Sequence, residues 1–391
     1  MIKTIRVMLL PNNKQQTKLF QYANAARFAY NWALGKEQEN YKNGGKFLSD
    51  NELRKEFTQL KKQPEYQWLN KVSNNVTKQA IKDACNTYKR FFKGQCKYPK
   101  FKSKKHFTPS FYQDNIKIQF IDTHVKVEGF SMSKKQNKQK LNWIRLAEHG
   151  RIPNENVKYM NPRIKYDGLN WYITVGIEYE DSTVLPTNEG IGIDLGIKDL
   201  AICSDNYTYI NINKTQKIKK LKKKKRRLQR KISRKYLKNK KGGSYCKTSN
   251  IIKSEKELLK LNHRLTNIRH NYLHQTTSEI INRKPKFKFI VLEDLNVKGM
   301  MKNKHLAKAI QEQCFYEFYR QIEYKCNWNN IKFITSDRYF PSSKLCSVCG
   351  NVKKELKLSD RIYHCSECGN VIDRDYQAAL NLAEYGRKLI I

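Results

Sequence analysis

The sequence predicts a multidomain α+β protein, and three changes in residue pattern lead to that prediction. Apolar residues recur every three or four positions over residues 14–95, which is the period of amphipathic helices. Between residues 116 and 179 they alternate instead, as they do in half-buried antiparallel strands. From residue 187 onward, short apolar strands alternate with helical stretches, an order typical of an α/β domain.

The charge of the chain indicates a polyanionic partner. The 391 residues include 78 Lys and Arg against 35 Asp and Glu, which gives a formal net charge of +43. Only 39% are hydrophobic, but these fall into periodic blocks that a disordered basic tail would lack, so the chain is expected to fold. No apolar run approaches the ~20 residues of a membrane span, so neither a membrane partner nor secretion is expected.

The N-terminal half is expected to combine helices with an antiparallel sheet. Residues 2–9 alternate as a short strand, and a turn at Pro11 leads into the helical block. The later alternation, clearest over residues 171–179, predicts a sheet or barrel that the first strand joins. The expected domains are therefore a β-barrel domain of residues 1–13 and 96–186 and a helical domain of residues 14–95.

The C-terminal half is expected to form one α/β domain of residues 187–340 and 370–391, interrupted by an insert at 341–369. Sixteen Lys or Arg residues lie within positions 217–241, on a helix that should pair with a second helix over 255–282. One helix over about 303–326, a strand at KFITSD and a last helix from Asp375 complete the expected elements.

The insert carries the strongest single signal, two Cys-x2-Cys pairs separated by fifteen residues. Each pair is followed by a glycine, and four thiolates complete a tetrahedral shell around one structural zinc ion. Four unrelated core cysteines would not explain the doubled spacing. The six other cysteines are interpreted as ordinary thiols of a reducing compartment, with a disulfide framework as the weaker alternative. The predicted zinc ligands are Cys346, Cys349, Cys365 and Cys368.

Three acidic residues stand where predicted strands end or the last helix begins. Asp194 interrupts the apolar segment IGIDLG, where a carboxylate is costly to bury unless it holds a cation. Glu293 ends FKFIVLE in the same way, and Asp375 begins the last helix, which Asp373 is expected to cap. Such a trio can hold two divalent cations, Mg²⁺ or Mn²⁺, and hydrolyse a phosphodiester.

Each acid taken alone has a simpler explanation, because acidic residues at strand ends more often form turns or caps. The segment GIDLG also opens the actin-like ATPase fold, but hydroxyl residues follow it there, whereas Ile197, Lys198 and Asp199 follow it here. The order of the three acids in so basic a chain favours a nuclease site over both alternatives.

Basic residues near aromatic ones predict contacts with nucleic acid. Lys and Arg arrays neutralise phosphates and release counterions, and aromatic rings can stack on unpaired bases. The simpler alternative is a solvated charged face, but sixteen like charges in one helical region would repel one another without a polyanion. The residues predicted to contact nucleic acid are Lys100, Lys102, Lys223, Arg226, Arg227, Arg230 and Lys231.

Together these motifs resemble the TnpB family, transposon-encoded RNA-guided DNA endonucleases with a RuvC-type nuclease domain, related to type V CRISPR effectors. The resemblance rests on GIDLGIKDLA, VLEDLNVKGM, DRYFPSSKLCSVCG with CSECG, and DRDYQAALNLA in the C-terminal half. YNWAL and YPKFK carry it in the N-terminal half, so it extends over nearly the whole chain.

The resemblance implies a role for each part. Asp194, Glu293 and Asp375 become the catalytic, Mg²⁺-binding triad of a ribonuclease H-like domain, and the cysteine insert becomes a zinc-binding module near the target strand. The β-barrel becomes a wedge domain, and the helical domain becomes a recognition lobe. A monomeric protein would bind a guide RNA from the transposon end and cut double-stranded DNA beside a short flanking motif. The implied location is the prokaryotic cytosol or nucleoid.

Two other functions stay open at this point. One is a nuclease-inactive, RNA-guided DNA-binding repressor, and the other is a transposase that performs strand transfer. All three acids are present, which argues against the repressor. One departure from the family pattern is Gln377, where Asn is common; the longer amide could shift a hydrogen bond near the catalytic carboxylate.

Overall fold

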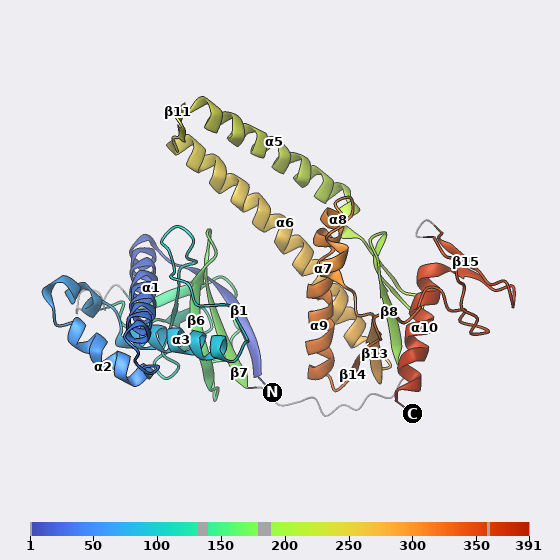
Figure 1. Ribbon diagram of the computed structural model, residues 1–391, viewed down its shortest axis with the longest axis horizontal. Helices are drawn as coiled ribbons and strands as arrows, with labels where there is room; N and C mark the ends of the chain where they lie inside the picture. The colour runs from blue at the N-terminus through green and yellow to red at the C-terminus, as the bar shows by residue number, and fades with distance from the viewer. Residues whose placement is uncertain (1, 132–139, 179–188, 358–359, 391) are drawn as a thin grey trace. The chain divides into compact units, whose positions relative to one another are not determined.

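The computed structural model describes residues 2–131, 140–178, 189–357 and 360–390. The chain divides into two compact units, Met1–Glu180 and Asp181–Ile391, and each has its own hydrophobic core (Figure 1). The boundary expected between residues 186 and 187 lies outside the described residues. Among the described residues, no helix has both the length and the apolar character that a membrane crossing requires.

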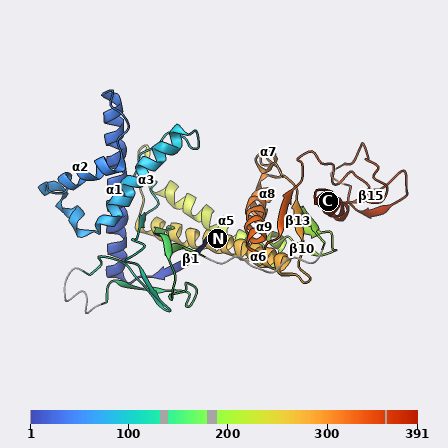
Figure 2. The same ribbon diagram turned by 90° about the horizontal axis from the view of Figure 1, so that it is seen from below.

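The N-terminal unit begins with one strand and a group of helices. The helices are α1 (Asn13–Lys42), α2 (Asp50–Leu60), the 3-10 helix η1 (Pro64–Lys71) and α3 (Asn74–Phe92). Capping boxes begin α1 at Asn12 and α2 at Ser49, because each side chain accepts from the third residue of its helix. The longest two helices, α1 and α3, pack against each other (Figure 2).

The rest of this unit is a seven-stranded antiparallel sheet in the order β2-β6-β7-β1-β5-β4-β3. Its strands are β1 (Ile2–Leu10), β2 (Ser110–Tyr112), β3 (Gln119–Ile121), β4 (His124–Lys126), β5 (Trp143–Leu146), β6 (Tyr159–Tyr166) and β7 (Trp171–Glu178). The N-terminal strand joins the sheet between β7 and β5, as expected.

The expectation of a closed barrel is wrong for the part of the chain that the structure describes. No hydrogen-bonded pair joins β2 to β3, so these two strands are the edges of an open sheet. The physical reason is their length: each has three residues and pairs with a single neighbour. An alternating pattern predicts strands but carries no information on whether the last strand returns to the first.

The C-terminal unit contains a five-stranded mixed sheet in the order β10-β9-β8-β13-β14. Three strands form an antiparallel meander, and β8, β13 and β14 run parallel. The strands are β8 (Ile191–Leu195), β9 (Asp199–Cys203), β10 (Thr208–Ile210), β13 (Phe289–Leu292) and β14 (Lys332–Thr335). A short 3-10 helix, η2 (Ile212–Lys214), follows β10.

A long helical hairpin interrupts this sheet between β10 and β13. Helices α5 (Gln216–Lys238) and α6 (Ser249–Asn282) lie side by side in Figures 1 and 2. The turn that joins them carries a small ladder of β11 (Lys240–Lys241) and β12 (Ser244–Tyr245), which turns at Gly242-Gly243.

The single helix expected over residues 303–326 is instead broken. The structure has α7 (Val297–Met300), α8 (Ala307–Gln313) and α9 (Phe315–Trp328). The break between α8 and α9 is at Cys314, whose backbone is left-handed with φ +57°. A periodic apolar pattern does not reveal a one-residue change of backbone direction.

Helices cover both faces of the mixed sheet. Ile290 and Leu292 of β13 pack in a core with α6 and α9, whereas Phe289 and Val291 pack with the last helix, α10 (Arg374–Lys388). This division follows from the two-residue period of a strand. Between β14 and α10 the chain forms the cysteine insert, which contains β15 (Ile362–His364) and β16 (Val371–Asp373).

Candidate metal centres and nucleic-acid interface

Two of the predicted acids occupy neighbouring positions on adjacent parallel strands. In the register of β8 and β13, Ile193 pairs with Leu292, so Asp194 and Glu293 are the next residues on each strand. Adjacent strands lie about 4.8 Å apart. Ile193 and Leu292 both belong to the core on the α6–α9 side. By alternation, the two carboxylates face α10.

The third acid, Asp375, lies in the first turn of α10. Asp373 caps this helix by accepting from the backbone N–H groups of Asp375 (2.9 Å) and Tyr376 (3.1 Å), as predicted. The helix can cross close to β8 because position 192 is glycine: a Cβ there would lie 2.2 Å from the carbonyl oxygen of Ala379. The close crossing brings Asp375 to the face that carries Asp194.

The charges of the three acids act on one another. Burial raises the pKa of Asp194 well above its usual range, and the negative charges of Glu293 and Asp375 raise it further, against the opposing effect of Arg374. Burial also raises the pKa of Glu293, although its Oε1 accepts a hydrogen bond from the Ser342 hydroxyl, which favours the ionised form. Crowded carboxylates of this kind favour a bound cation.

Arginine side chains accompany Asp375. Arg374 donates to its Oδ1 from Nε (3.0 Å) and Nη2 (2.8 Å), and Arg361 lies 3.5 Å from Oδ2. Within the described ranges, these three acids are not among the side chains whose donor atoms converge closely enough to hold an ion. The donor set consists of oxygens, which Mg²⁺ prefers, and the crowding of negative charge fits a divalent cation.

The four predicted zinc ligands do meet. Their sulfur atoms all lie within 4.8 Å of one another, with 3.6 Å between Cys346 and Cys368 and 3.5 Å between Cys349 and Cys365. Zinc–sulfur bonds of about 2.3 Å in a tetrahedron place sulfurs ~3.8 Å apart, so the spacing fits a zinc ion. All ten cysteines are free of disulfides.

The backbone shapes both cysteine pairs for metal binding. Gly350 and Gly369 adopt left-handed conformations with φ +75° and +71°, which other residues rarely adopt. The chain therefore turns back after each pair, and backbone N–H groups point at the sulfurs. Burial raises the pKa of Cys346, but hydrogen bonds from the backbone N–H groups of Cys349 and Val348 and from the thiols of Cys368 and Cys349 together lower it to about 6. Hydrogen bonds among the four thiols in turn raise the pKa of Cys349, so without a metal ion the cluster favours a thiolate at Cys346 rather than at Cys349.

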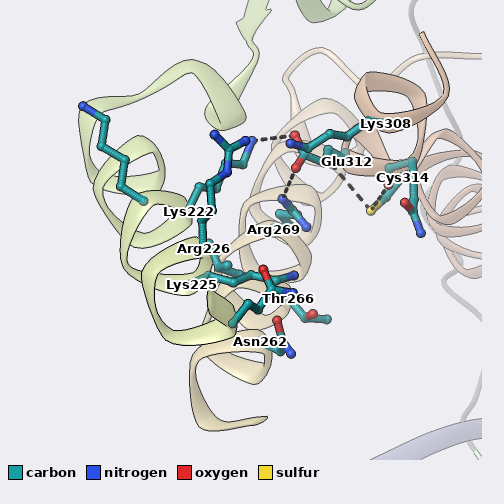
Figure 3. A pocket seen from close by; sticks show the side chains of 13 residues that line it. Lys222, Lys225, Arg226, Asn262, Thr266, Arg269, Lys308, Glu312 and Cys314 are labelled. Carbon is teal, nitrogen blue, oxygen red and sulfur yellow. Dashed lines mark hydrogen bonds and ion pairs between the residues drawn. The ribbon is translucent and has the colours of Figure 1, made fainter. Parts of the chain in front are cut away.

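The predicted nucleic-acid residues divide between the two units. Lys223 and Arg226 on α5 line a pocket between α5, α6 and α8, in which Arg269 and Lys308 also lie (Figure 3). The other three residues predicted on α5 are exposed: Arg227, Arg230 and Lys231.

In the N-terminal unit, Lys100 is exposed, but Lys102 is partly buried. The Lys102 ammonium lies 3.4 Å from the centroid of the Tyr30 ring, and burial lowers its pKa to about 8. The stack on Tyr30 occupies one side of this ammonium. Contacts of both residues with nucleic acid stay a prediction.

The sequence did not single out several residues of these sites. Ser342 reaches Glu293, and its carbonyl oxygen accepts from Asn381 Nδ2 of α10 at 2.7 Å. Arg269 and Lys308 belong to none of the motifs identified in the sequence. Their position beside α5 in the structure shows that they line the pocket. The only sequence signal for Ser342 was its place within the motif DRYFPSSKLCSVCG.

Three family models match separate parts of the chain. The OrfB model of IS605, described as a probable transposase, matches residues 174–304. A helix-turn-helix domain model of the same OrfB type matches residues 1–46, and a Cas12f1-like TNB domain matches residues 315–382.

Full-length relatives extend the match. The chain is 27% identical to a protein of Escherichia coli strain K12 provisionally named RNA-guided DNA endonuclease InsQ, over 100% of this chain and 93% of the relative. A Streptomyces pristinaespiralis protein with the same provisional description is 27% identical over 98% and 89% of the two chains. A solved complex of Cas12f1 with guide RNA and target DNA shares the fold, with a TM-score of 0.61 over 98% of both chains at 13% identity. The family models and these relatives therefore agree with the resemblance to the TnpB family that the sequence motifs carry.

Proposed function

We propose that this protein is a transposon-encoded, RNA-guided DNA endonuclease whose catalytic residues are Asp194, Glu293 and Asp375. The observation that carries the proposal is the register of β8 and β13, which places Asp194 beside Glu293 on the face covered by α10. Asp375 lies in the first turn of that helix. The two relatives named as RNA-guided DNA endonucleases support the same function.

The sheet order supports a ribonuclease H-like, RuvC-type nuclease domain. The sheet has three antiparallel strands followed by two parallel ones, and helices cover both of its faces. Asp194 lies near the carboxyl end of the first strand, Glu293 follows the neighbouring parallel strand, and Asp375 lies on the last helix. The proposed nuclease domain comprises residues 187–340 and 370–391, with the zinc insert at 341–369. The N-terminal unit would supply the wedge domain from its sheet and the recognition lobe from residues 14–95.

Each side chain has a task in phosphodiester cleavage. Asp194 and Glu293 present adjacent carboxylates, Ser342 orients Glu293 by donating to Oε1, and Arg374 holds Asp375 at the start of α10. When bound there, two divalent cations, Mg²⁺ or Mn²⁺, would activate water and stabilise the leaving oxygen. Cleavage would then leave a 5′-phosphate and a 3′-hydroxyl.

The net charge of +43 supports guide RNA and target double-stranded DNA as the partners. Pairing of the guide with one DNA strand would supply most of the sequence specificity, next to a short flanking motif read by the protein. The protein would act as a monomer within the ribonucleoprotein, in the prokaryotic cytosol.

The test uses the ribonucleoprotein purified from cells that also carry the DNA flanking the gene. Its RNA is sequenced, and a plasmid with the matching target and a randomised flank is presented in Mg²⁺. Wild type should linearise plasmids with a restricted set of flanks, whereas Asp194→Ala and Glu293→Ala should bind RNA and target but not cut. Glu323→Ala, an exposed acid on α9, is the matched control and should cut normally.

The products also distinguish the other two functions. Binding without cutting by wild type in any divalent metal would replace the nuclease with an RNA-guided repressor. Joined strands in place of free ends would identify a strand-transferring transposase. Cleavage retained in Asp194→Ala would overturn the assignment of the site.

A further inference from the structure

A basic pocket of about 770 Å³ lies between α5, α6 and α8 (Figure 3). It is formed by residues far apart in the sequence, and it lies outside the acidic trio. Six cationic side chains and one acid line it. The cations are Lys222, Lys223, Lys225, Arg226, Arg269 and Lys308, and the acid is Glu312.

Glu312, the single acid, forms ion pairs with only two of these cations. Figure 3 shows Lys222 of α5 and Arg269 of α6 reaching Glu312 from the two arms of the hairpin, and Arg269 Nη2 lies 3.3 Å from Glu312 Oε1. The other four cations have no acidic partner among the described residues. Six positive charges against one leave a net +5, and such repulsion favours a polyanionic ligand.

Buried polar side chains connect this pocket to the turn between β8 and β9. Arg269 Nε donates to Asn213 Oδ1 at 2.8 Å, and Asn213 Nδ2 donates to Gln313 Oε1 at 3.4 Å. Gln313 Nε2 then donates to the carbonyl oxygen of Gly196 at 2.7 Å and that of Asp199 at 3.5 Å. Asn213 is 8% exposed and Gln313 is 3% exposed, so water competes little with these bonds.

The turn that this network holds begins two residues after Asp194, at Gly196. Its two middle carbonyl groups are also held by side chains: Asn211 Nδ2 donates to Ile197 O at 2.8 Å, and Lys214 Nζ donates to Lys198 O at 2.8 Å. All four carbonyls of residues 196–199 therefore accept side-chain hydrogen bonds. Such a clamp fixes the end of β8, and with it the carboxylate of Asp194.

We propose that the pocket binds the sugar-phosphate backbone of a nucleic acid, and that Arg269, Asn213 and Gln313 are positioning residues linking this pocket to the Asp194 turn. A phosphate that neutralises the pocket removes the repulsion acting on Arg269 and stabilises its bonds to Glu312 and Asn213. The turn is then held more firmly when nucleic acid is bound. This inference rests on the proposed function. It adds a contact with nucleic acid at the pocket and a hydrogen-bonded connection from the pocket to the proposed catalytic residue Asp194.

The binding step is tested with the RNA that copurifies with the full-length protein, alone and with its target duplex. Arg226→Gln with Lys308→Gln should weaken binding and reduce the slope of log affinity against log salt by about 1.4 to 1.8, for two phosphate contacts. Lys220→Gln with Lys238→Gln, the same charge change on exposed α5 positions outside the pocket, should change both much less. If the pocket variant already binds RNA alone more weakly, the pocket contacts RNA. If its binding is weaker only when the target duplex is present, the pocket contacts target DNA.

The positioning step is tested by hydrogen exchange of residues 193–203 in the full-length protein without Mg²⁺. Nucleic acid should slow exchange in wild type and in Gln275→Met, an exposed glutamine of α6 outside the pocket. Gln313→Met should bind equally well but lose the slowing. Gln313→Glu, which keeps an acceptor for Asn213 but has no donor for Gly196, should behave in the same way even if the methionine variant folds poorly.

Two results would overturn the inference. One is an equal loss of binding affinity in the pocket double variant and the control double variant. The other is that nucleic acid still slows hydrogen exchange of residues 193–203 in both Gln313 variants. A wild-type protein that binds no nucleic acid would instead overturn the proposed function itself, so the two failures are distinguishable.

Discussion

At the scale of single residues, the site is dominated by the proximity of like charges. Asp194 and Glu293 follow a matched pair on adjacent strands, and burial together with mutual repulsion raises the pKa of Asp194. A carboxylate in this position is costly to keep ionised without a cation. Asp194, the proposed metal ligand, is therefore expected to reduce the stability of the metal-free protein.

The pH dependence of stability tests this expectation. Because the folded-state pKa of Asp194 is raised, its contribution to stability is complete below the usual aspartate pKa and is lost as the pH rises through the folded value. Asp194→Asn should therefore be more stable than wild type without Mg²⁺, with an advantage that grows from pH 5 to pH 8. Urea unfolding across that range measures it, with Glu323→Gln as the control; an advantage that shrinks with pH would contradict the burial of this charge.

At the scale of secondary-structure elements, close packing of α10 brings the third acid to the sheet. Gly192 on β8 lies against the backbone of α10, and Gly386 on α10 lies against β13, where a Cβ would be 2.4 Å from Val291 Cγ2. Neither position can take a side chain without moving the helix away from the sheet. The two glycines therefore set the separation of Asp375 from Asp194 and Glu293.

Gly192→Ala should accordingly destabilise the C-terminal unit by about 1–3 kcal/mol through overpacking, and should reduce cleavage more than it reduces nucleic-acid binding. Urea unfolding and the plasmid assay measure the two effects. Gly243→Ala in the hairpin turn is the matched control, because a Cβ there would meet nothing within 4 Å. Similar results for the two variants would show that α10 can shift at little cost.

The cysteine insert depends on the arrangement of its four cysteine sulfur atoms, which would surround one zinc ion. Structural zinc contributes about 10–16 kcal/mol of binding energy in small zinc domains, so losing one ligand is severe. Cys346→Ser should lower the zinc content and target engagement before it affects the catalytic step, whereas Cys246→Ser, an exposed cysteine outside the insert, should change neither. Normal zinc content, stability and cleavage in Cys346→Ser would refute the structural assignment.

At the scale of the whole molecule, the net charge of +43 opposes folding when no nucleic acid is bound. Raising the salt concentration from 0.1 to 0.5 M screens this repulsion and should raise the Tm of the nucleic-acid-free protein by several degrees, at about 2–4 °C for each kcal/mol. With RNA bound, the same salt should lower the Tm because it weakens binding. Scanning calorimetry of both forms makes the comparison, and a Tm that falls with salt in both would exclude self-repulsion as a major cost.

Features that depend on residues close together in the chain could be predicted from the sequence. These include the cysteine pairs with their glycines, the cap at Asp373, the basic helical hairpin and the motifs that resemble the TnpB family. Each rests on spacing of a few residues, which local geometry converts directly into structure. The acids could be named from the sequence for the same reason, as interruptions at the ends of apolar segments.

The way in which distant segments meet became visible only in the folded structure. The fold paired Ile193 with Leu292, left the N-terminal sheet open, broke the helix at Cys314 and brought Ser342 to Glu293. It also gathered the pocket from residues 222 to 314 and tied it to Gly196. Register, sheet order and side-chain networks depend on the packing of the whole unit, and no local period in the sequence contains that information.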